Sequence, residues 1–204
     1  RLVSKAHLEG FYYKPRMDKK LLEEYHDGLI AMSACLGGEI PQLILNGRLE
    51  DAKKTALWYK QTFGDFYLEI ERHPIPELEK VNQSLIEMSA ELDIPMTATN
   101  DIHYVLKEDA SAHDLLLCIG TNASVTDTKR MKMPGDFFYM MSPQEMEEHF
   151  RDIPEAVENT AHIADMCNLQ LDFERLHLPE IDLPEGKTPD EYLYDLCYQN
   201  LPQY

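Results

Sequence analysis

An aspartate and a histidine one residue apart could bind a metal ion. Residues 94–104 (IPMTATNDIHY) read as a short buried strand that ends in Asp101 and His103. Because strand side chains alternate between the two faces, positions 101 and 103 would point the same way. A carboxylate and an imidazole side by side at a strand end could hold a divalent metal. The alternative is that Asp101 caps a helix starting near Lys107, or fixes a turn, while His103 packs beneath it.

Two further segments could contribute to the same site. Cys35 follows another predicted strand, and the glycines after it would let the backbone bend so that a thiolate reaches a metal, although a small buried residue is the alternative. Glu69 and Glu71 are expected to share one face of the second strand, because strand side chains alternate between the two faces. His73, in the following loop, continues the same spacing. We expect Glu71 and His73 to lie near the metal or the substrate without binding the metal directly. The other histidines have no partner at ligand spacing, so we expect structural roles for them: His7, His26, His113, His149, His162 and His177.

Aromatic and basic residues lie together in residues 11–16 (FYYKPR), which end in Arg16. This combination could bind a single-stranded nucleic-acid end by phosphate contact and base stacking. An ordinary exposed loop is the alternative. The sequence has neither a glycine-rich phosphate loop nor a strand-elbow serine motif, which argues against an ordinary nucleotide hydrolase and a serine esterase.

Composition excludes several classes of protein. The 204 residues include 19 basic and 37 acidic side chains, a formal charge of −18, so the surface as a whole is unsuited to gripping a phosphate backbone. The four cysteines are widely spaced, which fits neither a disulfide framework nor a zinc ribbon. No apolar run approaches the roughly 20 residues of a membrane span, and no signal peptide is visible, so the sequence predicts a cytoplasmic protein without membrane contact.

The apolar pattern predicts alternating strands and helices. Strands are expected at 29–33, 66–71 and 95–101, with helices at 40–45, from 49 to near 64, and at 78–92 between them. The crossovers are long enough for parallel pairing, so we predict an α/β fold that is a barrel or part of one. Parallel strands place functional side chains at their C-terminal ends, where all the candidates above fall except Arg16.

Beyond His103 the pattern becomes mostly helical. Helices are predicted at 107–119, from the capping box that begins at Ser142, and at 154–167, with an irregular loop at 121–138. A connector rich in proline and acidic residues then leads to a second capping box at Thr188 and a final helix.

Four segments together resemble one family: EGFYYKPR (9–16), SACLGGEI (33–40), ATNDIHY (98–104), and AHD with LLCI (112–119). In order and spacing they are similar to the bacterial replicative, or C-family, DNA polymerase III alpha subunits. The resemblance implies that residues 1–175 are the C-terminal part of a polymerase and histidinol phosphatase (PHP) domain, an incomplete, distorted, TIM-like βα barrel. Residues 176–188 would be a connector, and residues 189–204 the truncated first helix of the polymerase module, a helical extension.

The resemblance also implies an activity and a ligand set. Members of the family perform template-directed DNA synthesis, and many carry a PHP domain with a zinc or manganese cluster and 3′-to-5′ proofreading exonuclease activity. Cys35, Asp101 and His103 match family metal ligands. The remaining ligands would precede Arg1, and the magnesium-dependent polymerase site would follow Tyr204, so we expect this segment alone to be inactive. DNA, a sliding clamp and a proofreading subunit are the implied partners.

Two other functions stay open at this point. The domain could be a structural module that braces the polymerase and contacts a separate proofreading subunit, since some family members have lost the metal site. It could also be a free-standing PHP phosphoesterase acting on a small phosphate ester. Retention of Cys35, Asp101 and His103 favours metal chemistry over the structural role.

Overall fold

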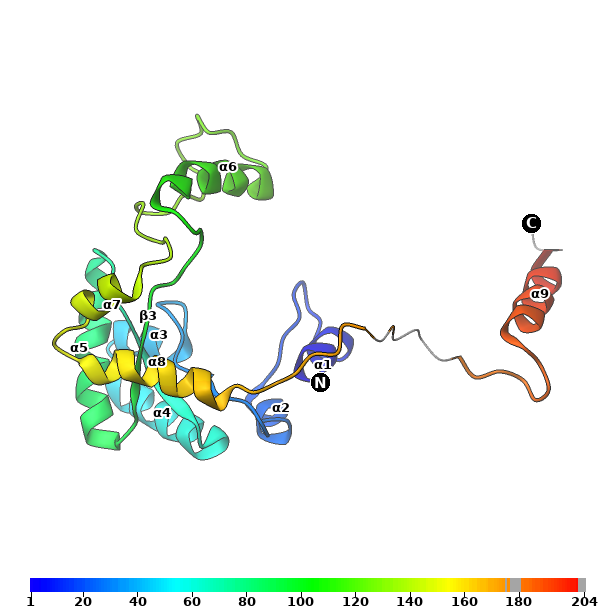
Figure 1. Cartoon of the computed structure of the whole chain (residues 1–204), viewed down its shortest axis with the longest axis horizontal. Helices are drawn as coiled ribbons and strands as arrows, with labels where there is room; N and C mark the ends of the chain where they lie inside the picture. Colours follow the sequence, from blue (N-terminus) through cyan, green and yellow to red (C-terminus); the bar gives the residue numbers. More distant parts are fainter. Residues whose placement is uncertain (175, 177–180, 202–204) are drawn as a thin grey trace. The chain divides into compact units, whose positions relative to one another are not determined.

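Three parallel strands form the centre of the fold. The computed structural model describes residues 1–174, 176 and 181–201, and within these β1 (Ala31–Met32), β2 (Phe66–Glu71) and β3 (Met96–Thr99) pair in the order β1-β2-β3 (Figure 1). The predicted α/β class and the parallel pairing of the strands are confirmed.

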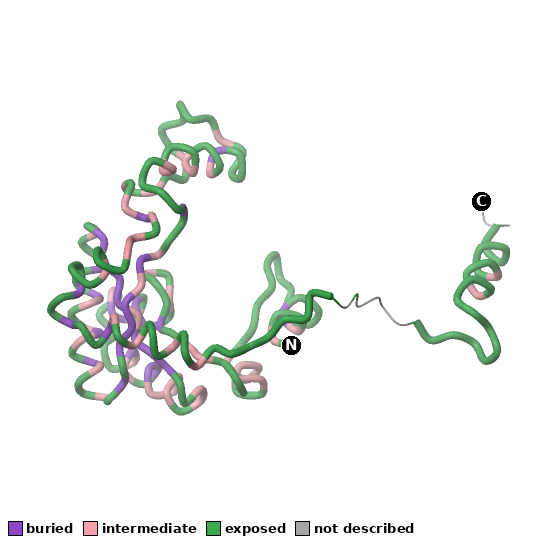
Figure 2. Tube along the Cα trace, in the orientation of Figure 1, coloured by how far each residue is buried: buried purple, intermediate pink, exposed green. Residues whose placement is uncertain are grey.

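The central strand β2 is buried on both faces. Phe66, Leu68 and Ile70 share one face and are each at most 1% exposed, and Tyr67 and Glu71 on the other face are each 5% exposed. The alternation of apolar and acidic residues from Leu68 to Glu71 resembles that of a half-exposed strand, yet both faces are covered. Figure 2 shows the buried residues gathered along the strands and the helix faces next to them. The hydrophobic core is therefore built around β2.

Helices connect and cover the strands. The chain passes from β1 to β2 through α3 (Glu39–Leu45) and α4 (Leu49–Phe63), and from β2 to β3 through α5 (Pro76–Leu92). The inner face of α5 repeats at helical spacing through Leu78, Val81, Leu85 and Met88, all buried. Later in the chain, α8 (Pro154–Met166) packs on β3, where the Asn159 side-chain amide donates a hydrogen bond to the Met96 carbonyl at 2.7 Å.

Two strands are shorter than the sequence predicts. β1 covers two residues instead of 29–33, and β3 ends at Thr99 instead of 101. In both places a residue other than glycine adopts a left-handed backbone just beyond the strand: Ala34 has φ 64° and Asp101 has φ 42°. An extended strand cannot continue through a positive φ, so the chain turns away from the sheet there.

The N-terminal elements are α1 (Leu2–Leu8) and α2 (Lys19–Glu24), joined by a narrow hairpin. The carboxylate of Asp18 caps α2 by accepting a hydrogen bond from the Leu21 N–H at 2.9 Å. This hydrogen bond pairs one of the N–H groups that the first turn of a helix leaves without a partner.

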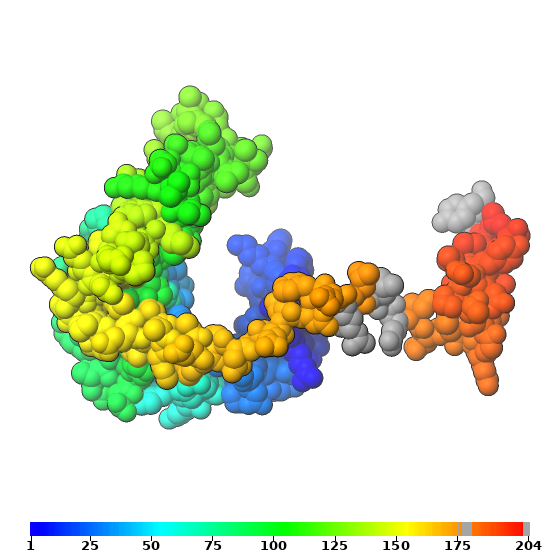
Figure 3. All heavy atoms as spheres, viewed as in Figure 1, coloured from blue at the N-terminus to red at the C-terminus, as the bar shows by residue number. Residues whose placement is uncertain are grey.

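Residues 107–136 form a lobe that leaves the body of the fold and returns to it. It contains η1 (Lys107–Asp109) and α6 (Ala110–Thr121), which ends at left-handed Asn122. In Figure 3 the green atoms of this segment project beyond the helices around the sheet. Its two ends meet at a parallel bridge between Tyr104 and Tyr139, after which α7 (Pro143–His149) starts with the predicted capping box of Ser142 and Glu145.

The chain divides into two compact units, residues 1–167 and 168–204. In the second unit, α9 (Pro189–Asn200) begins with the predicted capping box of Thr188 and Glu191. The proposed domain limits at 175 and 188 remain predictions. Residues 177–180 of the expected connector, including His177, and residues 202–204 of the expected last helix lie outside the described residues. Among the residues described, no helix is both long and apolar enough to cross a lipid bilayer.

Truncating a buried side chain of the central strand β2 should strongly destabilise the first unit. Leu68 is fully buried, so Leu68→Ala removes core contacts and leaves a cavity, which we expect to cost about 2–5 kcal/mol of unfolding free energy. Leu116→Ala is the matched control, because Leu116 on α6 is 64% exposed and its truncation should change stability by less than about 0.5 kcal/mol. Urea denaturation followed by circular dichroism measures both; equal losses would contradict the placement of β2 in the core.

Candidate functional site

The C-terminal ends of the strands bring most of the predicted site residues to one edge of the sheet. The register pairs Glu71, the last residue of β2, with Thr99, the last residue of β3. Cys35 follows β1, and its side chain lines a small hollow together with Glu69 and Glu71. Parallel sheets use this edge for chemistry because the loops that follow the strands converge there.

Asp101 and His103 lie beside each other, but not for the reason that the sequence suggests. Strand alternation does not apply to them, because β3 ends at Thr99 and the backbone of Asp101 is left-handed. Instead, the turn brings His103 Nδ1 within 2.7 Å of the Asp101 carbonyl oxygen and 3.8 Å of its carboxylate Oδ1. The expectation of adjacent side chains is met, while the strand geometry behind it is wrong.

The hydrogen bond at His103 leaves one ring nitrogen available. A carbonyl oxygen can only accept a hydrogen bond, so His103 Nδ1 carries the proton and donates a hydrogen bond to the Asp101 carbonyl oxygen. In the neutral ring, Nε2 then has a free lone pair, which is how most metal-binding histidines are held. Both side chains are about one-third exposed, so the lone pair and the carboxylate are accessible.

Asp101 does not cap the helix that follows it, so this alternative role is wrong. The first turn after residue 106 is capped by Asp109, whose carboxylate accepts a hydrogen bond from the Leu106 N–H at 3.0 Å. The Asp101 carboxylate is therefore not used to start that helix.

Glu71 is a buried carboxyl group in acidic surroundings. It is 5% exposed, and its backbone carbonyl accepts a hydrogen bond from Asn82 at 2.7 Å. Burial raises the pKa of Glu71 to about 7, and the charges of Asp101 and Glu69 add to the rise. Glu69 itself accepts a hydrogen bond from Thr99 Oγ1 at 2.7 Å. Glu71 therefore holds a proton near neutral pH more readily than an ordinary glutamate.

His73 is a buried histidine whose ring nitrogens both lack a hydrogen-bond partner in the described part of the chain. Its ring stacks on Phe137 at 5.0 Å and lies against Phe138 at 4.8 Å between centroids. Burial lowers the pKa of His73, which favours the neutral ring. Buried polar groups are normally paired, so these two nitrogens are available to a polar group that is not among the described residues, although the backbone of Asn100 lies close enough to oppose the fall in the pKa of His73.

One neighbour of the site was missed from the sequence. His113, on α6, has its ring centroid 5.6 Å from that of His103, and 5.4 Å from that of Tyr104. Helical spacing gives no sign of this, because the contact crosses the turn between β3 and α6. Arg16 is not part of this cluster: its described contacts are with Tyr12 and Gly10 in the N-terminal hairpin.

The three predicted ligands carry donor atoms that suit a transition metal, but the described residues do not form a complete set of ligands. Cys35, Asp101 and His103 offer sulfur, oxygen and nitrogen, the three ligand types that zinc accepts. Within residues 1–174, 176 and 181–201, however, no three His, Cys, Asp or Glu side chains come together closely enough to hold a metal ion. The bare nitrogens of His73 and the free Nε2 of His103 fit a site whose remaining ligands come from elsewhere.

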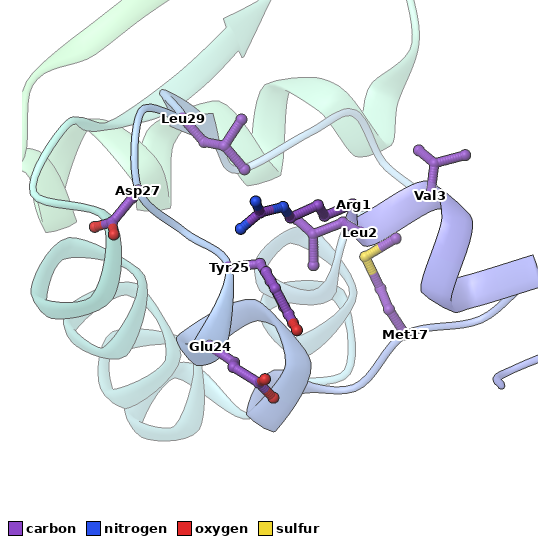
Figure 4. A pocket seen from close by; sticks show the side chains of 8 residues that line it. All are labelled: Arg1, Leu2, Val3, Met17, Glu24, Tyr25, Asp27 and Leu29. Carbon is purple, nitrogen blue, oxygen red and sulfur yellow. The ribbon is translucent and has the colours of Figure 1, made fainter. Parts of the chain in front are cut away.

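A second hollow lies at the N-terminal end, away from these residues. It has a volume of about 700 Å³, and Figure 4 shows Leu2, Met17, Tyr25 and Leu29 among the side chains that line it, with Glu24 and Asp27 at its border. None of the predicted metal ligands lines it, so it does not compete with the sheet edge as the candidate site.

Comparison with known proteins agrees with the family resemblance. The family model "PHP domain" matches residues 1–73. A DNA polymerase III subunit alpha from Borreliella burgdorferi is 50% identical over 204 residues, covering 98% of this chain and 18% of the relative. The proteins of the same name from Deinococcus radiodurans and Thermus aquaticus are each 45% identical, over 95% and 98% of this chain and 15% and 17% of their own lengths. The chain thus spans less than a fifth of the curated relatives it matches.

The buried Glu71 should make the stability depend on pH. Its carboxyl has a pKa of about 7 when folded and an ordinary value of 4.5, so the folded state binds the proton more tightly than the unfolded state. The contribution of Glu71 to the free energy of unfolding is therefore greatest below pH 4.5, and it is lost as the pH rises through 7. We expect a loss of about 1–3 kcal/mol between pH 5 and 8, allowing for solvent screening.

Urea denaturation at several pH values measures this loss, with Glu71→Gln as the test variant and Glu77→Gln, on the first turn of α5, as the control. The first variant should flatten the pH dependence and the second should preserve it. An unchanged slope in Glu71→Gln would contradict the assignment.

Proposed function

Because this chain belongs to the DNA polymerase III alpha subunit family, we propose that it supplies part of a metal-dependent 3′-to-5′ exonuclease site in a replicative DNA polymerase. The observation that carries the proposal is the pair of Asp101 and His103 at the C-terminal edge of the sheet, with His103 Nε2 free to bind a metal. Cys35 is the third proposed ligand, contributed from the loop after β1.

The three strands would then be part of a larger, distorted PHP-type βα barrel. In the described residues β1 and β3 are the edges of the sheet, and each pairs on one side only. Unpaired edges are normally covered or continued. Further strands of the same protein would continue this sheet and would carry the remaining ligands at the same edge.

A divalent zinc or manganese ion held there would activate a water molecule and neutralise negative charge on the phosphodiester under attack. The role of this chain is to hold and shape the site. Asp101 and His103 fix two ligand positions through their shared turn, and His73 lies buried against the rings of Phe137 and Phe138. Glu71, with a pKa of about 7, could hold or release a proton beside them.

The activity of the whole protein is part of the same proposal, since the chain covers less than a fifth of its relatives. We propose template-directed DNA synthesis at a magnesium site outside this chain. DNA, a sliding clamp and a proofreading subunit would be its partners, in the cytoplasm. The names of the relatives support the polymerase, whereas the exonuclease rests on the arrangement at the sheet edge.

The test is metal content and exonuclease rate in the full-length subunit that contains this chain. Asp101→Asn and His103→Ala should each weaken metal binding by at least about tenfold, measured by elemental mass spectrometry after dialysis, and slow removal of a mispaired 3′ nucleotide by a similar factor. His162→Ala, on the exposed side of α8, is the control and should change neither quantity.

The outcomes separate the proposed functions. Loss of metal and exonuclease together in the two site variants supports the exonuclease. Unchanged metal content and rate in both variants would refute it and leave the bracing module that contacts a separate proofreading subunit. Metal-dependent hydrolysis of small phosphate esters without exonuclease activity would point to a PHP phosphoesterase.

A further inference from the structure

The hairpin at residues 10–16 is closed tightly at its base. The Arg16 N–H donates to the Gly10 carbonyl at 3.2 Å, and the Tyr12 N–H donates to the Lys14 carbonyl at 3.1 Å. A Cβ at Gly10 would lie 2.1 Å from the Arg16 carbonyl oxygen, so only glycine allows the two sides to approach this closely. In Figure 1 this hairpin is the narrow blue loop between α1 and α2.

The tip of the hairpin exposes three consecutive aromatic side chains. Phe11 is 61% exposed, Tyr12 is 65% exposed and Tyr13 is 82% exposed. Tyr13 also has a φ of 59°, a left-handed conformation that is unfavourable for a residue with a side chain. Burial does not offset this strain, because the ring packs so little against the protein. The position therefore keeps a strained tyrosine that does little for the core.

Arg16 and the two tyrosine rings of the hairpin are in contact with one another. The Arg16 guanidinium lies over the Tyr12 ring, 5.5 Å from its centroid, and its Nε–H donates to the Tyr12 carbonyl at 3.2 Å. The two terminal nitrogens of Arg16 have no described partner, so they could donate two hydrogen bonds to one phosphate. Tyr13 meets Tyr12 edge to face at 4.6 Å and is 82% exposed, so most of its ring surface is available for contact with a planar group.

The hairpin is locally basic in a strongly acidic chain. Lys14 and Arg16 form no ion pair within the described residues, whereas the nearest acidic side chains are engaged. Glu9 pairs with Lys5 at 2.8 Å, and Asp18 caps α2. Two cations without an ion-pair partner among the described residues thus lie beside exposed aromatic rings, in a chain that carries a formal charge of −18.

We propose that this hairpin binds single-stranded DNA, with Arg16 on a phosphate and Tyr13 stacked on a base. Stacking on exposed aromatic rings and contact of basic side chains with the backbone are the two interactions by which proteins hold single strands of any sequence. Duplex DNA is excluded from this mode because its bases are already stacked. The proposal does not depend on the metal chemistry of the sheet edge.

The experiment is binding of a fluorescent oligo(dT) to the 204-residue chain, followed by anisotropy in a buffer with EDTA so that no metal contributes. Tyr13→Gly should weaken binding at least fivefold, and it should also preserve or raise the melting temperature, because glycine relieves the strained φ. Arg16→Gln should weaken binding and lower the slope of log K against log salt concentration by about 0.7, the value for one phosphate contact on a single strand.

The matched control is a pair of exposed tyrosines elsewhere in the chain. The rings of Tyr194 and Tyr198 on α9 are in contact, with centroids 4.4 Å apart, and the residues are 59% and 58% exposed. The helix is acidic, since it also carries Asp190, Glu191 and Asp195. The double variant Tyr194→Ala with Tyr198→Ala should bind oligo(dT) as the unaltered chain does. An equal loss in this control would overturn the proposal, because exposed aromatics in general would then be responsible.

Photo-crosslinking gives a readout that also works in a longer protein containing this chain. An oligonucleotide with 5-iododeoxyuridine should form adducts that mass spectrometry maps to residues 11–13. Adducts only elsewhere, equal affinity for duplex and single strand, or no binding of oligo(dT) would each overturn the proposal.

Discussion

The arrangement of the candidate site depends on the pairing of β2 with a strand on each side. Its buried backbone groups must be hydrogen-bonded, and β1 and β3 provide the partners, as when the Leu68 N–H donates to the Pro95 carbonyl at 2.9 Å. The ladder fixes the register, and the register fixes which loops meet beyond the strand ends. A shift of β3 by one residue would exchange its two faces and separate Glu71 from the turn that holds Asp101.

That edge of the sheet concentrates groups that are unfavourable in isolation. Three carboxyl groups, Glu69, Glu71 and Asp101, lie near one another, and their mutual repulsion contributes to the raised pKa of Glu71. His73 adds a buried ring whose nitrogens have no hydrogen-bond partner among the described residues. Fold stability alone would favour apolar residues at such positions, and proteins retain arrangements of this kind where a site needs them. Next to this edge, Arg72 connects the end of β2 to α7 and the loop after it, by donating to the His149 carbonyl and by forming a bidentate ion pair with Asp152.

The sequence predicts most of the elements and only part of the site. The aromatic and apolar residues of β2, the helical spacing of α5 and the capping boxes at Ser142 and Thr188 are local signals, and each is found where expected. The left-handed turn at Asp101 has no such signal, since nothing in an aspartate requires a positive φ. The approach of His113 to His103 is equally hidden, because it follows from the path of the chain after the strand and not from spacing.

The bridge between Tyr104 and Tyr139 has a consequence for how this protein can change over time. Both ends of the lobe at 107–136 are held at one place, where the Met140 N–H donates to the Tyr104 carbonyl at 3.2 Å. A segment anchored in this way behaves as an insertion, and its length costs little in closure entropy. Residues between the anchors, other than His113 beside His103, can therefore be added, lost or replaced while the sheet and its C-terminal edge keep their geometry, so most of the lobe is free to evolve at a different rate from the site.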